Sequence, residues 1–230
     1  MHPTALSNGK RFFEAYKEPL SEISNGKIIE IGSRDINGSL RSCAPAKFEY
    51  IGVDFAAGEG VDVVLDSPYT LPFEDASIDI VLSSSCFEHS EMFWLVFLEI
   101  MRVLKPEGLF YLNAPSNGDF HRYPVDCWRF YPDSGKALIS WAKRNNINSV
   151  LLESYVSNQY LDQWNDFVAI FLKDEQHISK YEKRILDDFN DFRNGQRTGV
   201  SGFLNPSDSP EDRLKIRAID NIIKNGVVPS

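Results

Sequence analysis

Short apolar runs alternate with longer segments of helical period from the start of the chain to Lys173. The runs predict strands at 27–31, 50–55, 61–65, 78–82, 109–113, 150–156 and 167–172. The segments predict helices at 12–23, 91–105 and 136–143, with a turn at 105–108. Strands separated by helices form a parallel sheet, whereas the short connection at 157–166 predicts a closing antiparallel hairpin. The pattern therefore predicts an α/β fold with a doubly wound, mostly parallel sheet.

The pattern changes after Lys173. Apolar residues recur on one helical face at Ile178, Tyr181, Ile185, Phe189 and Phe192. A polar linker follows, and a second helix is predicted to open at Ser209-Pro210-Glu211-Asp212 with an apolar stripe at Leu214, Ala218 and Ile222. We therefore expect a domain at 1–173 and a helical C-terminal extension at 174–230. The extension's apolar faces need a partner surface, either the domain itself or a twin subunit in a homodimer.

Composition and charge narrow the function classes. The chain has 230 residues, 43% of them apolar, and a net charge of −9, which disfavours nucleic-acid binding. Cys43, Cys86 and Cys127 are too few and too scattered for a disulfide framework or a zinc site, so we expect a reduced protein without bound metal. The charged segment from Met1 to Leu20 predicts no signal peptide, and Glu99 and Arg102 interrupt the longest apolar segment. A cytoplasmic protein without a membrane partner is expected.

The first predicted strand ends in a ligand-binding pattern. Glu30 and Gly32 close that strand, and Asp54 stands at the end of the next one. The spacing between Gly32 and Asp54 suits a carboxylate that binds ribose hydroxyls, either of a nicotinamide dinucleotide or of S-adenosylmethionine. A pyrophosphate needs a G-x-G-x-x-G turn, but Arg34 and Ile36 stand where small residues are required. S-adenosylmethionine has no phosphate, so it fits this loop better than a dinucleotide does. The alternative is a turn between strand and helix that binds no ligand.

Further motifs follow in order along the chain: Asp66, Leu71-Pro72-Phe73, Ile78-Asp79-Ile80-Val81 and, at 99–108, EIMRVLKPEG. Together with Glu30-x-Gly32 and Asp54, they resemble the class I S-adenosylmethionine-dependent methyltransferases, in particular the small-molecule branch. The resemblance covers about residues 25–173. It implies a Rossmann-like, seven-stranded sheet whose last two strands form the hairpin.

The resemblance also implies S-adenosylmethionine as the cofactor and assigns residues to it. Glu30, Gly32 and Ser33 would line the methionine half, and the second glycine of the loop, Gly38, comes later than in the family's usual G-x-G-x-G. Asp54 would bind the ribose. Asp66 and Ser67 would contact adenine, although Asp66 could instead cap a turn, and Ser83 would lie beneath the sulfonium.

Two segments at the expected carboxyl edge of the sheet carry the candidate acceptor chemistry. One is 83–89, which ends in His89, and the other is the long loop 113–131. The HRYPVDCWRFY string at 121–131 of this loop resembles an H-x-x-P-x-D-x-W-R-F-T element of methyltransferases of bacterial surface-glycan pathways, with Tyr131 in place of threonine. Methyl transfer to a hydroxyl needs a proton acceptor, so His121 and His89 are the catalytic candidates.

The remaining polar residues of that loop are candidates for acceptor binding. We expect Tyr123 and Trp128 to stack on a ring, Asp126 to orient His121 or hold a hydroxyl, and Arg129 to bind an acidic group. A structural Asp126–Arg129 pair that fixes the loop is an equal alternative. The predicted function is methyl transfer to a small polar acceptor, such as a hydroxyl or amine of a sugar or glycan precursor. A quinone-like acceptor and a non-catalytic interaction module that binds the cofactor are the alternatives.

Overall fold

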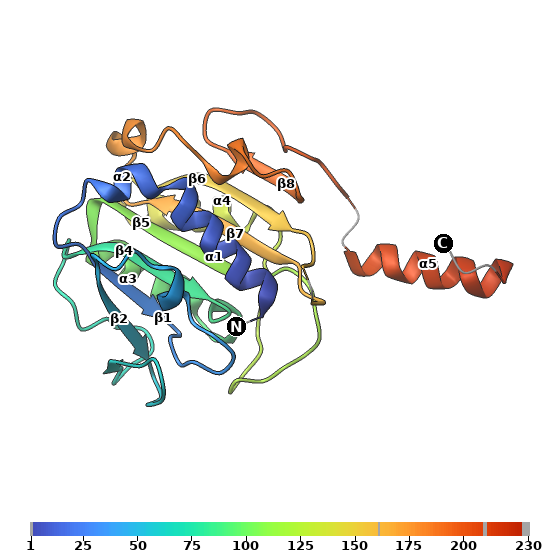
Figure 1. The fold of residues 1–230 in the computed structure, drawn as a ribbon, viewed down its shortest axis with the longest axis horizontal. Helices are drawn as coiled ribbons and strands as arrows, with labels where there is room; N and C mark the ends of the chain where they lie inside the picture. The colour runs from blue at the N-terminus through green and yellow to red at the C-terminus, as the bar shows by residue number, and fades with distance from the viewer. Residues whose placement is uncertain (1, 161, 209–210, 227–230) are drawn as a thin grey trace.

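The computed structural model describes residues 2–160, 162–208 and 211–226, and its centre is an eight-stranded sheet in the order β3-β2-β1-β4-β5-β7-β6-β8 (Figure 1). The strands are β1 (Lys27–Ile31), β2 (Glu49–Asp54), β3 (Val63–Val64), β4 (Ile78–Ser84), β5 (Leu104–Pro115), β6 (Val150–Ser157), β7 (Asp166–Leu172) and β8 (Phe192–Arg197). The first five are parallel, and β7, β6 and β8 each run antiparallel to the neighbour before them in this order. The predicted mostly parallel sheet with an antiparallel hairpin is confirmed, with one strand more than expected.

Helices cover both faces of the sheet. The helices are α1 (Pro3–Ala15), α2 (Lys17–Ser21), α3 (Phe93–Val103), α4 (Ser134–Arg144) and α5 (Glu211–Asn225), and the short 3-10 helices are η1 (Leu40–Cys43), η2 (Phe87–His89), η3 (Glu175–Lys180) and η4 (Ile185–Asp187). Helices α3 and α4 bury Phe97, Ile100 and Leu138 on one face, and α1 buries Phe12 on the other. Every residue of β4 is buried, because apolar layers lie on both of its sides.

The predicted helix over 178–192 does not form. The chain makes the turns η3 and η4 and then β8, which pairs with the edge of β6. The buried carboxylate of Glu153 on β6 accepts the backbone N–H groups of Ile185 and Leu186, at 2.8 and 3.0 Å, and the hydroxyl of Tyr16, at 2.7 Å. These bonds and the burial of Ile185 and Leu186 fix turns where the local apolar spacing alone favours a helix.

Smaller differences concern where elements end. The predicted opening helix is two helices divided at Tyr16, and the predicted turn at 105–108 is the first part of β5. Helix α5 forms as predicted, although its expected start at Ser209-Pro210 lies outside the described residues. In the described part of the chain, no helix combines the length and apolar character needed to cross a bilayer.

Helix α5 lies apart from the body, at the end of an extended linker (Figure 1). Its isoleucines Ile216, Ile219 and Ile223 are exposed. Within the described residues, the predicted contact of this helix with the domain is therefore not made, and a homodimer through it stays a prediction.

The topology places a crevice at the carboxyl ends of β1 and β4. From β1 the chain proceeds outward through β2 and β3, and it then returns to β4 and proceeds the other way through β5. The loops after β1 and β4 therefore separate to opposite faces and leave a crevice between them, which is where open α/β sheets bind ligands.

Candidate functional site

A cavity of about 630 Å³ opens at this crevice. This volume suits a small-molecule site. Five of the residues predicted to bind the cofactor line it, and all five come from the ends of β1 and β2 and the loop after β1: Glu30, Gly32, Ser33, Gly38 and Asp54. The α/β topology has thus brought the turn after β1 and Asp54, at the end of β2, to one wall of the cavity.

The turn after β1 requires glycine at position 32. Gly32 has φ +79°, and a Cβ there would lie 2.5 Å from the Cβ of Cys86. The N–H groups of Gly32 and Ser33 both donate to the carbonyl oxygen of Val53, at 3.0 and 3.2 Å. The turn after β1 is therefore held against the end of β2, and the side chain of Cys86, from the turn after β4, occupies the space that a Cβ at position 32 would need.

The two acids on this wall are held by hydrogen bonds. Glu30 is 3% exposed, and its Oε2 accepts from the hydroxyls of Tyr50 and Ser39 at 2.7 and 3.1 Å. Burial raises the pKa of Glu30, and these hydrogen bonds oppose the rise. Asp54 accepts the backbone N–H groups of Arg34 and Ala56 at 3.3 and 3.0 Å. Both carboxylates thus have fixed orientations at the cavity wall.

Three other residues predicted to bind the cofactor are not in the cavity's described lining. Asp66 is exposed, and Ser67 accepts the N–H of Tyr69 at 3.3 Å in a local turn. Ser83 is fully buried, and its neighbours Ser84 and Ser85 line the cavity in its place. The roles of Asp66, Ser67 and Ser83 stay predictions.

Buried hydroxyls with unmet hydrogen-bonding capacity indicate that this wall is built for a polar ligand. Among the described residues, the Oγ atoms of Ser33, Ser84 and Ser85 are buried without a hydrogen-bond partner, and all three side chains belong to residues that line the cavity. Such groups are costly unless a ligand or water satisfies them. Together with Glu30 and Asp54, they fit the amino acid and ribose parts of S-adenosylmethionine.

The two histidines predicted to be catalytic also line the cavity. His89 comes from η2, directly after β4, and His121 comes from the loop after β5; both line the cavity. The Nδ1 of His89 lies 2.5 Å from the carbonyl oxygen of Val125, and the Nδ1 of His121 lies 3.0 Å from that of Asp119. Desolvation lowers the pKa of His89, and the nearby His121 lowers it further.

Glu88 is a lining residue that the sequence analysis did not select. Its side chain is 1% exposed, and burial raises its pKa to about 8. Its Oε1 lies 3.7 Å from the Nε2 of His89. The sequence signal for Glu88 is an acid next to a histidine in the turn that follows the buried strand β4.

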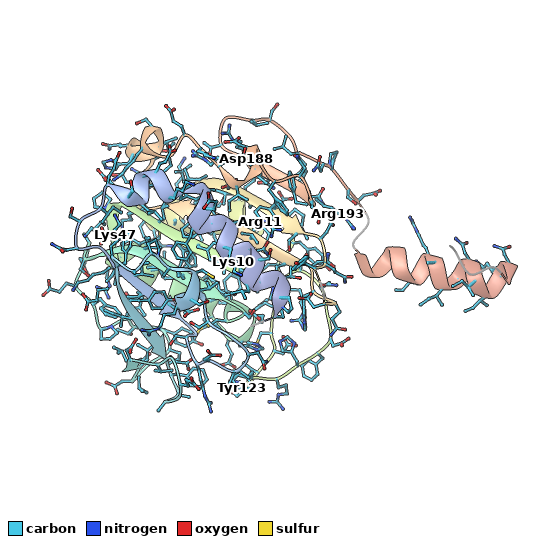
Figure 2. The ribbon with its side chains drawn as sticks, viewed as in Figure 1. Lys10, Arg11, Lys47, Tyr123, Asp188 and Arg193 are labelled. Atoms are coloured by element: carbon cyan, nitrogen blue, oxygen red, sulfur yellow. The ribbon has the colours of Figure 1, made fainter. Side chains whose placement is uncertain are left out.

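The predicted acceptor residues fall into two groups. Tyr123, at the edge of the body in Figure 2, lines the cavity, whereas Asp126, Trp128 and Arg129 are not in its described lining. The carboxylate of Asp126 receives two hydrogen bonds from Arg129, at 2.6 and 2.8 Å, and one from the backbone N–H of His121, at 2.8 Å. Arg129 therefore lowers the pKa of Asp126 to about 2. This geometry supports the alternative in which the pair fixes the loop.

Trp128 also has a structural contact. Its indole N–H donates to the carbonyl oxygen of Ser90 at 2.9 Å, and the backbone N–H groups of Cys127 and Trp128 donate to that of Glu88. These bonds tie the loop after β5 to the turn after β4. Binding of the acceptor by Asp126, Trp128 and Arg129 stays a prediction.

Four further lining residues were not among the predicted site residues: His2, Arg34, Arg122 and Trp164. The ring of Trp164 lies 5.0 Å from that of His121 and 5.7 Å from that of His2, measured between centroids. His2 reaches this place because Asp162, a residue far along the chain, contacts its Nδ1 at 3.1 Å. Contacts between residues so far apart in the chain, such as His2 and Asp162, produce no recognisable pattern in a short stretch of sequence.

Comparison with known proteins finds similarity to methyltransferases. Residues 31–112 match the family model described as a methyltransferase domain. A curated relative, the phthiotriol/phenolphthiotriol dimycocerosates methyltransferase 1 of Mycobacterium ulcerans, is 30% identical over 123 residues, which are 46% of this chain and 44% of the relative. The chain thus matches less than half the length of that relative.

Solved structures share the fold at low sequence identity. The 1,6-didemethyltoxoflavin-N1-methyltransferase of Burkholderia thailandensis, solved with 1,6-didemethyltoxoflavin and S-adenosylhomocysteine, aligns with a TM-score of 0.55 at 13% identity, over 74% of this chain and 79% of that one. The YcgJ protein of Bacillus subtilis aligns with a TM-score of 0.50 at 16% identity, over 76% of this chain and all of that one. Both similarities concern the fold.

Proposed function

We propose that this chain is a class I S-adenosylmethionine-dependent methyltransferase and that it transfers the methyl group of that cofactor to a hydroxyl of a small polar acceptor. One observation carries the proposal: the acids Glu30 and Asp54, from the ends of β1 and β2, and the histidines His89 and His121, from the loops after β4 and β5, line the same cavity. A bound cofactor and a proton acceptor would therefore lie in one cavity.

The wall at β1 and β2 would hold the cofactor. Glu30 attracts the ammonium group, Asp54 accepts hydrogen bonds from the ribose hydroxyls, and the open turn at Gly32 lets the methionine part pass close to the backbone. When bound, S-adenosylmethionine supplies a methyl group whose bond to sulfur breaks, with the electron pair left on sulfur, as the acceptor oxygen bonds to the carbon.

The wall at His89 and His121 would position the acceptor and take its proton. His121 is the better proton acceptor, because its ring lies in the loop that faces the cavity and is 39% exposed, whereas desolvation lowers the pKa of His89. Arg122 and Tyr123 line the same side and suit a polar acceptor with a ring, such as a sugar. Holding the oxygen near the methyl carbon supplies much of the acceleration in such displacements.

A lipid-like acceptor is the second candidate. The curated relative is named for phthiotriol and phenolphthiotriol dimycocerosates, and Phe120, beside His121 in the loop, is 76% exposed. An apolar chain attached to a hydroxyl could lie on this residue. The two candidates differ in what surrounds the hydroxyl and share the proposed proton transfer.

Product analysis tests the proposal. The purified chain is incubated with S-adenosylmethionine and two acceptor panels, one of sugars and sugar nucleotides and one of phenolic and long-chain alcohols, and mass spectrometry detects gain of one methyl group. We expect an O-methylated product from the sugar panel. Methylation confined to the lipid-like panel would select the second candidate. Tight binding of S-adenosylhomocysteine with methylation of neither panel would favour the non-catalytic alternative.

A further inference from the structure

Three side chains with metal-binding atoms lie close together in the part of the cavity lined by His89 and His121. Glu88 and His89 belong to η2, and His121 belongs to the loop after β5. One potential ligand atom from each lies within 4.8 Å of the other two. A tetrahedral zinc ion with bonds of about 2.0–2.1 Å holds its ligand atoms about 3.4 Å apart, so the 3.7 Å between Glu88 Oε1 and His89 Nε2 is already close to that spacing.

Both imidazoles are held in the tautomer that leaves Nε2 free to bind a metal. The Nδ1 of His89 faces the carbonyl oxygen of Val125, and the Nδ1 of His121 faces that of Asp119. A carbonyl oxygen only accepts, so in each ring Nδ1 carries the proton and Nε2 has the lone pair. Metal-binding histidines are oriented in this way by their second nitrogen.

The carboxylate of Glu88 lacks a positive partner of its own. Its Oε2 is buried without a hydrogen-bond partner among the described residues, and its Oε1 faces the lone pair of His89 Nε2. The nearby guanidinium of Arg129 instead makes its side-chain ion pair with Asp126. A buried oxygen in this state is costly, and a cation between Glu88 and the two rings would satisfy it.

We propose that Glu88, His89 and His121 bind one divalent metal ion, with zinc the best match to two imidazoles and one carboxylate. This departs from the metal-free protein that the cysteine count predicts. The ion's binding follows from these contacts alone, whereas its purpose rests on the proposed function. An ion held by three protein ligands keeps a position open for the acceptor hydroxyl. The metal would acidify that hydroxyl, so its proton would pass to water, and His121 would then serve as a ligand in place of a base.

Metal binding by the full chain tests this directly. The protein is treated with a chelator, dialysed and titrated with Zn²⁺ alone, in the absence of cofactor and acceptor, and bound metal is measured by elemental analysis and calorimetry. We expect one Zn²⁺ per chain. Affinity should fall about 100-fold in Glu88→Gln and in His121→Gln, since each removes a ligand. The control His177→Gln removes a surface histidine that lies 3.6 Å from Glu107, and it should bind as the parent does.

A second measurement does not depend on the folding of a variant. Co²⁺ bound to the parent chain at this site should give the intense visible absorption of a low-coordinate cobalt centre, and Zn²⁺ should abolish it. Absence of stoichiometric binding, or binding lost in His177→Gln and kept in Glu88→Gln, would overturn the metal site. Methyl transfer that continues in excess chelator, with no metal bound, would overturn the proposed catalytic purpose of the ion and leave the proposed function intact. Metal binding without methylation of any acceptor would support the metal site and contradict the proposed function.

Discussion

The ring of His89 meets the ring of His121 edge to face, with centroids 4.9 Å apart and an interplanar angle of 89°. The two residues come from loops that follow different strands, and Trp164 contacts His121 from another side. His121 is therefore held in place inside the cavity while its ring stays accessible.

This placement makes His121 the most informative residue to change. In His121→Ala, we expect turnover to fall by about 10²–10⁴, because the cavity loses the imidazole that accepts the proton of the acceptor hydroxyl or, with metal bound, holds the ion that acidifies it. Affinity for S-adenosylhomocysteine should not change, since Glu30 and Asp54 belong to β1 and β2 and not to the loop of His121. Steady-state kinetics and calorimetry measure the two quantities. Unchanged turnover would remove His121 from the chemistry, and His177→Ala is the control for loss of an unrelated histidine.

Asp54 is expected to determine much of the cofactor affinity. Asp54→Ala loses hydrogen bonds from the ribose to a charged acceptor, which are worth about 1.5–3 kcal/mol, or about tenfold to hundredfold in affinity. The N–H groups of Arg34 and Ala56 bond to different oxygens of Asp54, so Asp54→Asn removes the charge and keeps an acceptor for one of them, whereas Asp54→Ala removes both acceptors. Calorimetric titration with S-adenosylhomocysteine measures both variants. Parent-like affinity in both would exclude a ribose contact.

Cofactor affinity should depend on pH through Glu30. Burial raises the pKa of Glu30 above its ordinary value of 4.5, so the folded chain protonates this carboxyl at a higher pH than an exposed glutamate. The charged form attracts the cofactor's ammonium group. Affinity for S-adenosylhomocysteine should therefore be constant well above the raised pKa and fall as the pH decreases through it. Glu30→Gln should bind weakly at every pH, and a variant that reproduces the parent's pH profile would contradict the assignment.

The Asp126–Arg129 pair should matter for the loop after β5 more than for cofactor binding. In Arg129→Met, the buried carboxylate of Asp126 loses two charged hydrogen bonds, and we expect a loss of about 1.5–3 kcal/mol in unfolding free energy together with reduced turnover. The matched control is Arg122→Met, which removes an exposed arginine of the same loop and should keep the parent's stability. Thermal melts that rank the two variants in the opposite order would contradict the structural role.

Two truncations should separate the parts of the C-terminal segment. A chain that ends at residue 208 lacks α5 and should melt like the parent, because α5 lies apart from the body. A chain that ends at residue 173 also loses β8 and the buried Tyr181, Ile185 and Phe192, each worth about 1.5–3 kcal/mol of burial. It should be strongly destabilised or insoluble. Equal melting temperatures for both truncations would show that the segment 174–208 adds nothing to stability.

The central strands could be predicted from the sequence because their signal is local. The run at 78–82 is apolar at nearly every position, as expected of a strand covered on both faces, and Gly32 and Asp54 mark where β1 and β2 end. The general rule that parallel strands end at one edge then places Glu30, Asp54 and His89 near one another, as the structure finds.

The other features of the fold and the site depend on contacts between residues that are far apart in the sequence. Ile178, Tyr181 and Ile185 have helical spacing, but the buried Glu153, which belongs to β6 and lies well before them in the chain, fixes the segment around Ile185 in turns. Glu88 and His121 are likewise distant in the sequence, and only the docking of the loop after β5 onto η2 brings them together.

The contact between His2 and Asp162 makes the first residues of the chain part of the cavity wall. The N–H of Thr4 also donates to Asp162, at 2.8 Å, so the start of α1 is anchored beside the cavity lining. An affinity tag fused ahead of His2 would therefore begin next to a residue of the cavity wall. Protein for binding and turnover assays is better prepared with the tag after α5, a helix that lies apart from the sheet and its cavity.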